Sequence, residues 1–232
     1  MKHFLLSITF SLVAAGQTLP VMQQKPLWPD APGEIEITRD GIRYTAKDKD
    51  ESRDWTWLDI QYFDRMSSTE FVILTYEDQK SRLGQDRQYR FKITDGELTD
   101  QMLATVTRGL RRPLTNRVVP KTVNSTYSIP VKHLHAFGGC EGVLEFTRDA
   151  IYYKTDNEKD AREWKLDRDI ESVWSSDPYK LEIYAYDNNR REFSRSKVFR
   201  FDLKEKLDPD FYRSLKLKLY RLDSAGPPSL AK

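Results

Sequence analysis

Three side chains that could hold a transition metal lie close together near the middle of the chain: His133, His135 and Cys140. On a β-strand, residues i and i+2 point to the same face, so both imidazoles would face one ion. Cys140 follows the Gly138-Gly139 turn, which could bring its thiol back toward the two rings. Histidine nitrogen and cysteine sulfur are preferred ligands of zinc. The pattern therefore predicts either a metal or haem site at these three residues, or a buried structural cysteine that binds nothing.

A second distinctive feature is a run of basic side chains without acidic neighbours. No Asp or Glu occurs between Gln101 and Cys140, whereas residues 33–100 hold 16 acidic and 11 basic residues, a net charge of −5. Two hypotheses explain this pattern. The basic segment binds an anionic surface or polymer, such as a lipid leaflet or a polysaccharide, or it docks on the acidic segment of its own chain. The candidate residues are Arg108, Arg111, Arg112, Arg117, Lys121 and Lys132.

Recognisable catalytic motifs are absent from the sequence. It has no Gly-rich phosphate loop, no HExxH, no Gly-x-Ser-x-Gly and no CxxC. A net charge of +2 over 232 residues argues against a dedicated nucleic-acid binder, and a single cysteine excludes an intramolecular disulfide. We therefore expect a non-catalytic binding or scaffold protein without a cofactor, whose partner is a protein or a component of the cell envelope.

The N-terminus predicts export. Lys2 and His3 precede an apolar run over residues 4–15, and Ala14-Ala15-Gly16 supplies small residues at a cleavage position. The apolar run is too short to span a bilayer comfortably. Residues 1–16 are therefore expected to be a signal peptide, with the mature chain soluble in the periplasm or outside the cell.

The remaining chain contains an internal repeat. Residues 33–44 align with residues 142–153, and Trp55 aligns with Trp164, at an offset of about 109 residues. Solenoid repeats are much shorter, about 20 to 50 residues, so this period indicates a duplicated unit.

Each unit is expected to contain several strands followed by a helix. In the first unit, residues 33–38 and 41–46 alternate between apolar and polar side chains, and Asp40-Gly41 between them predicts a type I′ hairpin turn. The second unit has Asp149-Ala150 there, which predicts a different turn. Apolar residues at helical spacing predict a helix after residue 100, and a capping aspartate followed by proline predicts another from residue 208.

This order of elements, with a tryptophan in mid-unit and a final helix, resembles the pleckstrin-homology superfold, including its bacterial and GRAM-like relatives. Two copies behind a signal peptide resemble uncharacterised exported bacterial proteins. The resemblance implies a mainly β protein with two helices, arranged as two tandem PH-like antiparallel barrels or sandwiches, each closed by a C-terminal helix. The family binds lipid headgroups, but the loops 47–51 and 156–160 carry at least as much acid as base, which argues against a phosphoinositide ligand. The expected boundaries are a signal peptide at 1–16, PH-like domains at 21–112 and 131–222, a basic linker at 113–130 and a flexible tail at 223–232.

Overall fold

The computed structural model describes residues 17–79, 85–187 and 196–224. The predicted signal peptide and nearly all of the predicted tail lie outside these described residues. Neither of the described α-helices has both the length and the apolar character needed to cross a membrane.

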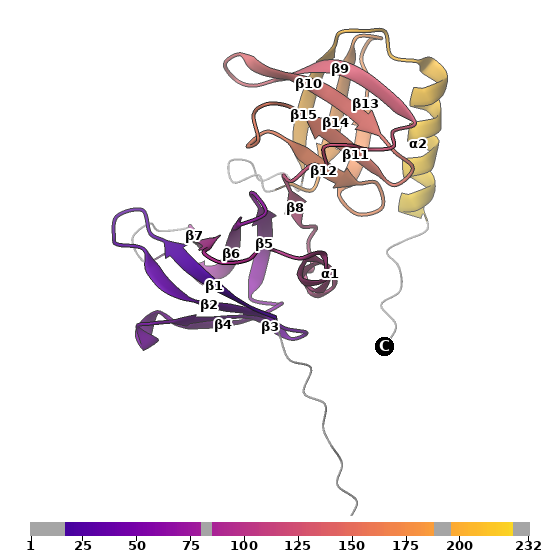
Figure 1. Cartoon of the computed structure of the whole chain (residues 1–232). Coiled ribbons are helices and arrows are strands. Elements are labelled where there is room, and N and C mark those ends of the chain that lie inside the picture. Colours follow the sequence, from indigo (N-terminus) through magenta and orange to yellow (C-terminus); the bar gives the residue numbers. More distant parts are fainter. Residues whose placement is uncertain (1–16, 80–84, 188–195, 225–232) are drawn as a thin grey trace, which may run out of the picture.

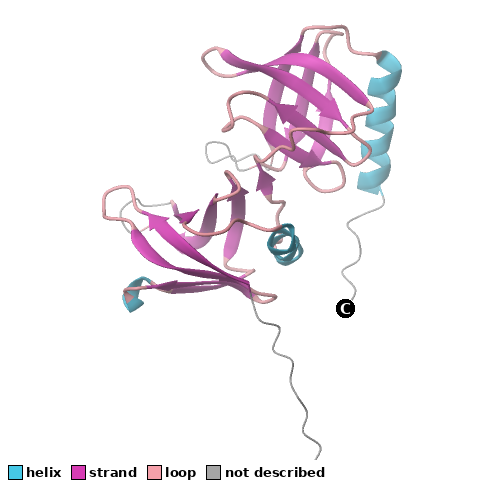
Figure 2. Ribbon diagram, viewed as in Figure 1, coloured by secondary structure: helices cyan, strands magenta, loops and turns pink. Residues whose placement is uncertain are grey.

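The described chain consists of strands, one short 3-10 helix and two α-helices (Figures 1 and 2). We refer to residues 17–112 as the N-terminal half, 113–126 as the linker and 127–224 as the C-terminal half. The N-terminal half contains β1 (Gln17–Gln24), β2 (Ala31–Ile37), β3 (Gly41–Ala46), η1 (Lys49–Glu51), β4 (Arg53–Thr56), β5 (Ile60–Arg65), β6 (Glu70–Asp78), β7 (Asp86–Ile93) and α1 (Asp100–Gly109). The linker contributes β8 (Thr115–Asn116). The C-terminal half contains β9 (Tyr127–Leu134), β10 (Gly139–Phe146), β11 (Ala150–Lys154), β12 (Arg162–Lys165), β13 (Ile170–Trp174), β14 (Lys180–Ala185), β15 (Lys197–Leu203) and α2 (Pro209–Ser224).

The strands of both halves belong to a single sheet. Their order is β13-β14-β15-β9-β10-β11-β12-β8-β5-β6-β7-β1-β2-β3-β4. The short strand β8 joins the halves, because it pairs in parallel with β5, at Asp64 opposite Thr115, and antiparallel with β12, at Glu163 opposite Asn116. Figure 1 shows β8 between the indigo-to-magenta N-terminal half and the C-terminal half, which runs from rose-pink to yellow.

This topology corrects the predicted architecture. A mainly β protein with two helices is confirmed, but the prediction of two tandem barrels or sandwiches, each closed by its own helix, is wrong. Among the described residues the strands form one fifteen-stranded sheet that ends at β13 and β4, and no pairing closes either half on itself. The physical reason lies in β8, whose backbone supplies hydrogen-bond partners to the edges of β5 and β12 that would otherwise remain open.

Each half nevertheless buries its own apolar cluster. In the N-terminal half, Phe71 stacks between Phe63 and Phe91, with ring centroids 5.1 and 5.4 Å apart. Helix α1 lies against β2 and buries Met102 and Val106, which lie four residues apart on one face. The cluster of the C-terminal half is built from alternate residues of its strands and from the inner face of α2, which lies against β13.

The turn between β2 and β3 differs from the predicted type I′ geometry. That turn needs positive φ at both central residues, yet among the described residues only Gly96 and Gly138 have positive φ. The hydroxyl of Thr38 organises the turn instead, because its Oγ1 accepts hydrogen bonds from the backbone N–H groups of Asp40 and Gly41, each at 3.2 Å.

The turn between β10 and β11 is built in the same way, so the predicted difference between the two turns is also wrong. Thr147 Oγ1 accepts from the backbone N–H groups of Asp149 at 3.3 Å and Ala150 at 3.0 Å. Gly41 is required for a different reason than its φ angle: a Cβ at that position would lie 1.9 Å from the carbonyl oxygen of Trp55.

Candidate metal centre

Strand β9 presents His133 and, directly after its end, His135 on one side of the sheet, as the two-residue spacing predicts. His133 is buried, with 6% of its surface exposed. Its ring lies 5.0 Å from that of Phe201, 5.4 Å from that of Phe199 and 5.6 Å from that of Tyr153, measured between centroids. His135 is exposed, so the pair extends from the interior of the C-terminal half to its surface.

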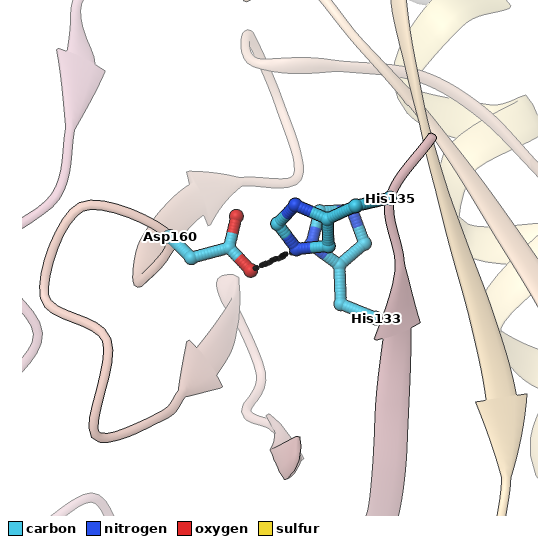
Figure 3. A group of neighbouring side chains, drawn as sticks. All are labelled: His133, His135 and Asp160. Atoms are coloured by element: carbon cyan, nitrogen blue, oxygen red, sulfur yellow. Dashed lines mark hydrogen bonds and ion pairs between the residues drawn. The ribbon is translucent and has the colours of Figure 1, made fainter. Parts of the chain in front are cut away.

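Asp160 completes a group of three potential ligands. It lies in the loop between β11 and β12, where its backbone N–H donates to the carbonyl of Asn157 at 2.8 Å. Its carboxylate Oδ2 lies 2.7 Å from Nδ1 of His133 and 3.0 Å from Nε2 of His135. The ligand atoms of these three residues all lie within 4.8 Å of one another. Figure 3 shows the carboxylate facing the two imidazole rings.

The electrostatics of the group favour an ionised carboxylate. Burial by itself raises the pKa of Asp160, but the hydrogen bond and charge of His133, followed by those of His135, outweigh burial and hold the pKa below its usual value. The site therefore offers one anionic oxygen beside two imidazole nitrogens.

The structure places Cys140 outside this group. Cys140 lies directly opposite His133 in the pairing of β9 with β10, but its Sγ is 3.4 Å from Nδ2 of Asn157, and it is not among the three residues whose ligand atoms converge. The structure thus brings His133 and His135 together and adds Asp160, which the sequence analysis did not single out. It sits in a loop of mixed charge 25 residues further along the chain, and no spacing signal points to it.

The donor set suits a transition metal. Zinc takes histidine nitrogen and carboxylate oxygen at about 2.0–2.2 Å, which places ligand atoms of a tetrahedral site about 3.3 Å apart. To admit the ion, the distances from Asp160 Oδ2 to the imidazole nitrogens of His133 and His135, now 2.7 and 3.0 Å, would have to widen by about 0.6 and 0.3 Å. Three protein ligands leave a fourth position for water or another group, as in an open zinc site.

Of the six basic residues singled out in the sequence, Arg117 docks within the molecule. Its guanidinium forms a two-pronged ion pair with Asp64 of β5, with Nε–Oδ1 at 2.9 Å and Nη2–Oδ2 at 2.6 Å, and Nη1 donates to the carbonyl of Lys159 at 2.7 Å. Lys132 lies on β9 opposite Glu141 of β10. The remaining four side chains are exposed at the surface: Arg108, Arg111, Arg112 and Lys121.

A second polar network, which the sequence did not indicate, links the two halves at Asp187. Its Oδ1 accepts hydrogen bonds from the Tyr62 hydroxyl at 2.7 Å and from Thr115 Oγ1 at 2.6 Å. Its Oδ2 lies 3.1 Å from Nε of Arg162. Burial raises the pKa of Asp187, but the charges of Arg162 and Lys197 and the two hydroxyl hydrogen bonds outweigh burial and lower it to about 2.

Comparison with known proteins gives little further guidance. No family model and no curated protein matches the chain. Among solved structures, the structure of the Spt16D Pob3N heterodimer is similar to 75% of this chain and 84% of the matched chain, with 10% sequence identity and a TM-score of 0.30. A similarity at this TM-score is too weak to support an argument about fold or function.

Proposed function

We propose that this protein is a non-catalytic metal-binding protein that takes Zn²⁺ or a similar transition-metal ion at His133, His135 and Asp160. The observation that supports the proposal is the convergence of three ligand atoms within 4.8 Å from two separate segments, the end of β9 with the residue after it and the loop between β11 and β12. We further propose that it acts outside the cytoplasm, on the strength of its signal-like residues 1–16.

The choice of metal follows from the donors. Imidazole suits Zn²⁺, Cu²⁺ and Ni²⁺, whereas calcium and magnesium prefer sites made wholly of oxygen ligands. The nearby cations do not repel the ion strongly, because Arg162 and Lys197 both lie against the carboxylate of Asp187, at 3.1 and 3.9 Å. The buried His133 fixes one side of the site, and the exposed His135 leaves a path for the ion to enter.

The proposal is tested by titrating the purified chain with Zn²⁺ against a chromophoric competitor. We expect one ion per chain, a tenfold or greater loss of affinity in His135→Gln and Asp160→Asn, and unchanged affinity in two controls, Asp156→Asn in the same loop and Cys140→Ser. Affinity should fall as the pH is lowered, because metal-bound imidazole must be unprotonated. Absence of Zn²⁺ binding, or binding that Asp160→Asn leaves intact, would overturn the proposal.

A second candidate function is binding to an anionic component of the cell envelope. It is favoured by the exposure of Arg108, Arg111 and Arg112 at the C-terminal end of α1 and just beyond it, with Lys121 further along the linker. We expect the chain to sediment with vesicles containing phosphatidylglycerol at low salt and to be released at high salt.

The matched variant for this second function replaces Arg111, Arg112 and Lys121 together by alanine. Its control is Arg43→Ala, which removes an exposed arginine that pairs with Glu36 and Asp54. Salt-insensitive sedimentation, or equal sedimentation of the triple variant and the control, would exclude anionic-surface binding through this segment.

A further inference from the structure

Resting on the proposed function, we propose that metal binding at His133, His135 and Asp160 is coupled to the docking of the two halves of the chain, and that the ion pair between Arg117 and Asp64 carries part of this coupling. The metal would then strengthen the contact between the halves, and the contact would strengthen metal binding.

The loop that carries Asp160 is attached to its surroundings through its backbone. The residues on either side of it are held through their carbonyl oxygens by two arginines. Lys159 O accepts from Nη1 of Arg117 at 2.7 Å and from Nη1 of Arg162 at 2.8 Å, and Ala161 O accepts from the same nitrogen of Arg162 at 2.7 Å. The backbone of the proposed ligand is thus clamped immediately before and after the carboxylate.

Both arginines also connect to the N-terminal half. Arg117 reaches Asp64 of β5 directly. Arg162 pairs with Asp187, which accepts a hydrogen bond from Tyr62, also on β5. Asp64 and Tyr62 lie two residues apart on the same strand, so they share one face of β5. One strand of the N-terminal half therefore anchors, through two arginines, the loop that presents Asp160.

The attachment of this loop affects the free energy of metal binding. An ion between the three ligands requires the carboxylate to sit slightly further from the imidazoles than its present 2.7 and 3.0 Å. A loop held at a defined distance loses less freedom when it binds than a loop that is free to move. Partners that orient metal ligands typically contribute 10- to 100-fold in metal affinity. Because coupling between two binding events is reciprocal, bound metal must stabilise the docked halves by the same factor.

The discriminating variant is Asp64→Asn, measured by Zn²⁺ titration of the full chain. Asp64 belongs to the N-terminal half, and its described hydrogen bonds go to Arg117 rather than to the ligand loop. The substitution removes the charge that Arg117 pairs with, and it leaves the carbonyl oxygen of Lys159 available to Nη1 of Arg117. We expect about a tenfold loss of Zn²⁺ affinity. The matched control is Asp54→Asn, which removes an exposed carboxylate of the same half, and it should leave the affinity unchanged.

The reciprocal measurement is amide hydrogen exchange of the linker strand β8 and Arg117. Zn²⁺ should slow exchange there about tenfold in the unsubstituted chain and leave it unchanged in Asp160→Asn. Equal Zn²⁺ affinity of Asp64→Asn and the unsubstituted chain would overturn the coupling while the metal site stands. Failure of the unsubstituted chain to bind Zn²⁺ would overturn the proposed function itself, and the coupling with it.

Discussion

Replacing Asp187 by asparagine tests the buried network between the halves most severely. The side chains of Asp187 and Arg162 are 5% and 4% exposed. An asparagine can still accept hydrogen bonds from Tyr62 and Thr115, but it leaves the guanidinium of Arg162 buried without a neutralising carboxylate. Removing one partner of a buried ion pair costs about 3–5 kcal/mol, so we expect the free energy of unfolding of Asp187→Asn at pH 6 to fall by that amount.

The pKa of Asp187 makes this difference depend on pH, with a definite sign. The pKa is about 2 in the folded chain and 3.8 when unperturbed. Because the folded value is lower, the ionised carboxylate stabilises the fold fully above about pH 4, and this stabilisation is lost as the pH falls toward 2. A difference of nearly two pKa units corresponds to about 2 kcal/mol. Asparagine does not titrate, so Asp187→Asn does not lose stability in this way as the pH falls.

The assay is urea unfolding from pH 6 to pH 2, followed by tryptophan fluorescence, on the unsubstituted chain and Asp187→Asn. Urea is chosen because it does not screen charges. Other titrating groups, including Asp160, are common to both chains and cancel in the difference. The stability gap between them should narrow by about 2 kcal/mol between pH 4 and pH 2. This account of the network would be refuted if the difference in free energy of unfolding between the two chains stayed constant from pH 4 to pH 2, or if the two chains were equally stable at pH 6.

Three further substitutions test the packing of the two halves. Gly109→Ala would stabilise an ordinary helix by about 1 kcal/mol, but here its Cβ would lie 2.2 Å from the ring of Trp57, so we expect a lower Tm, and a raised Tm would contradict this. Thr99→Ala removes the side-chain oxygen that accepts from the backbone N–H of Met102 at 3.2 Å, and it should cost about 1 kcal/mol in urea unfolding; a negligible change would exclude the cap as a stabilising contact. Phe199→Ala should cost about 3–5 kcal/mol in the same assay, because the ring is fully buried, and a loss below 1 kcal/mol would show that the cluster collapses to fill the space.

The candidate site was predictable from sequence only where local periodicity determined it. His133 and His135 share a side of the sheet because strand residues alternate, and the sequence contains that information. Asp160 reaches them because its loop, which contains a backbone hydrogen bond from Asp160 to Asn157, brings the carboxylate to 2.7 Å from Nδ1 of His133. No spacing rule relates residues 25 positions apart on a loop, and the mixed charge of residues 156–160 indicated only a solvated segment.

The fold shows the same limit. Strands and helices followed from alternation and helical spacing, but the joining of both halves into one sheet depends on β8, whose two residues are too few to show any period. The geometry of the two hairpin turns, by contrast, could have been predicted from the sequence. The sequence Thr-Arg-Asp occurs at both turns. A threonine hydroxyl that accepts a hydrogen bond from a backbone N–H two residues further on is a known turn-forming contact.

The position of the short strand β8 between the halves determines how fragments of the chain will behave. An N-terminal fragment that ends before residue 113 lacks β8, one of the two strands that pair with β5. A C-terminal fragment that begins after residue 126 lacks β8, one of the two strands that pair with β12. Either fragment would then present an open strand edge, which is a template for pairing with another molecule. We therefore expect separately produced halves to associate edge to edge, and fragments meant to stay monomeric will need that edge blocked by a charge or a proline.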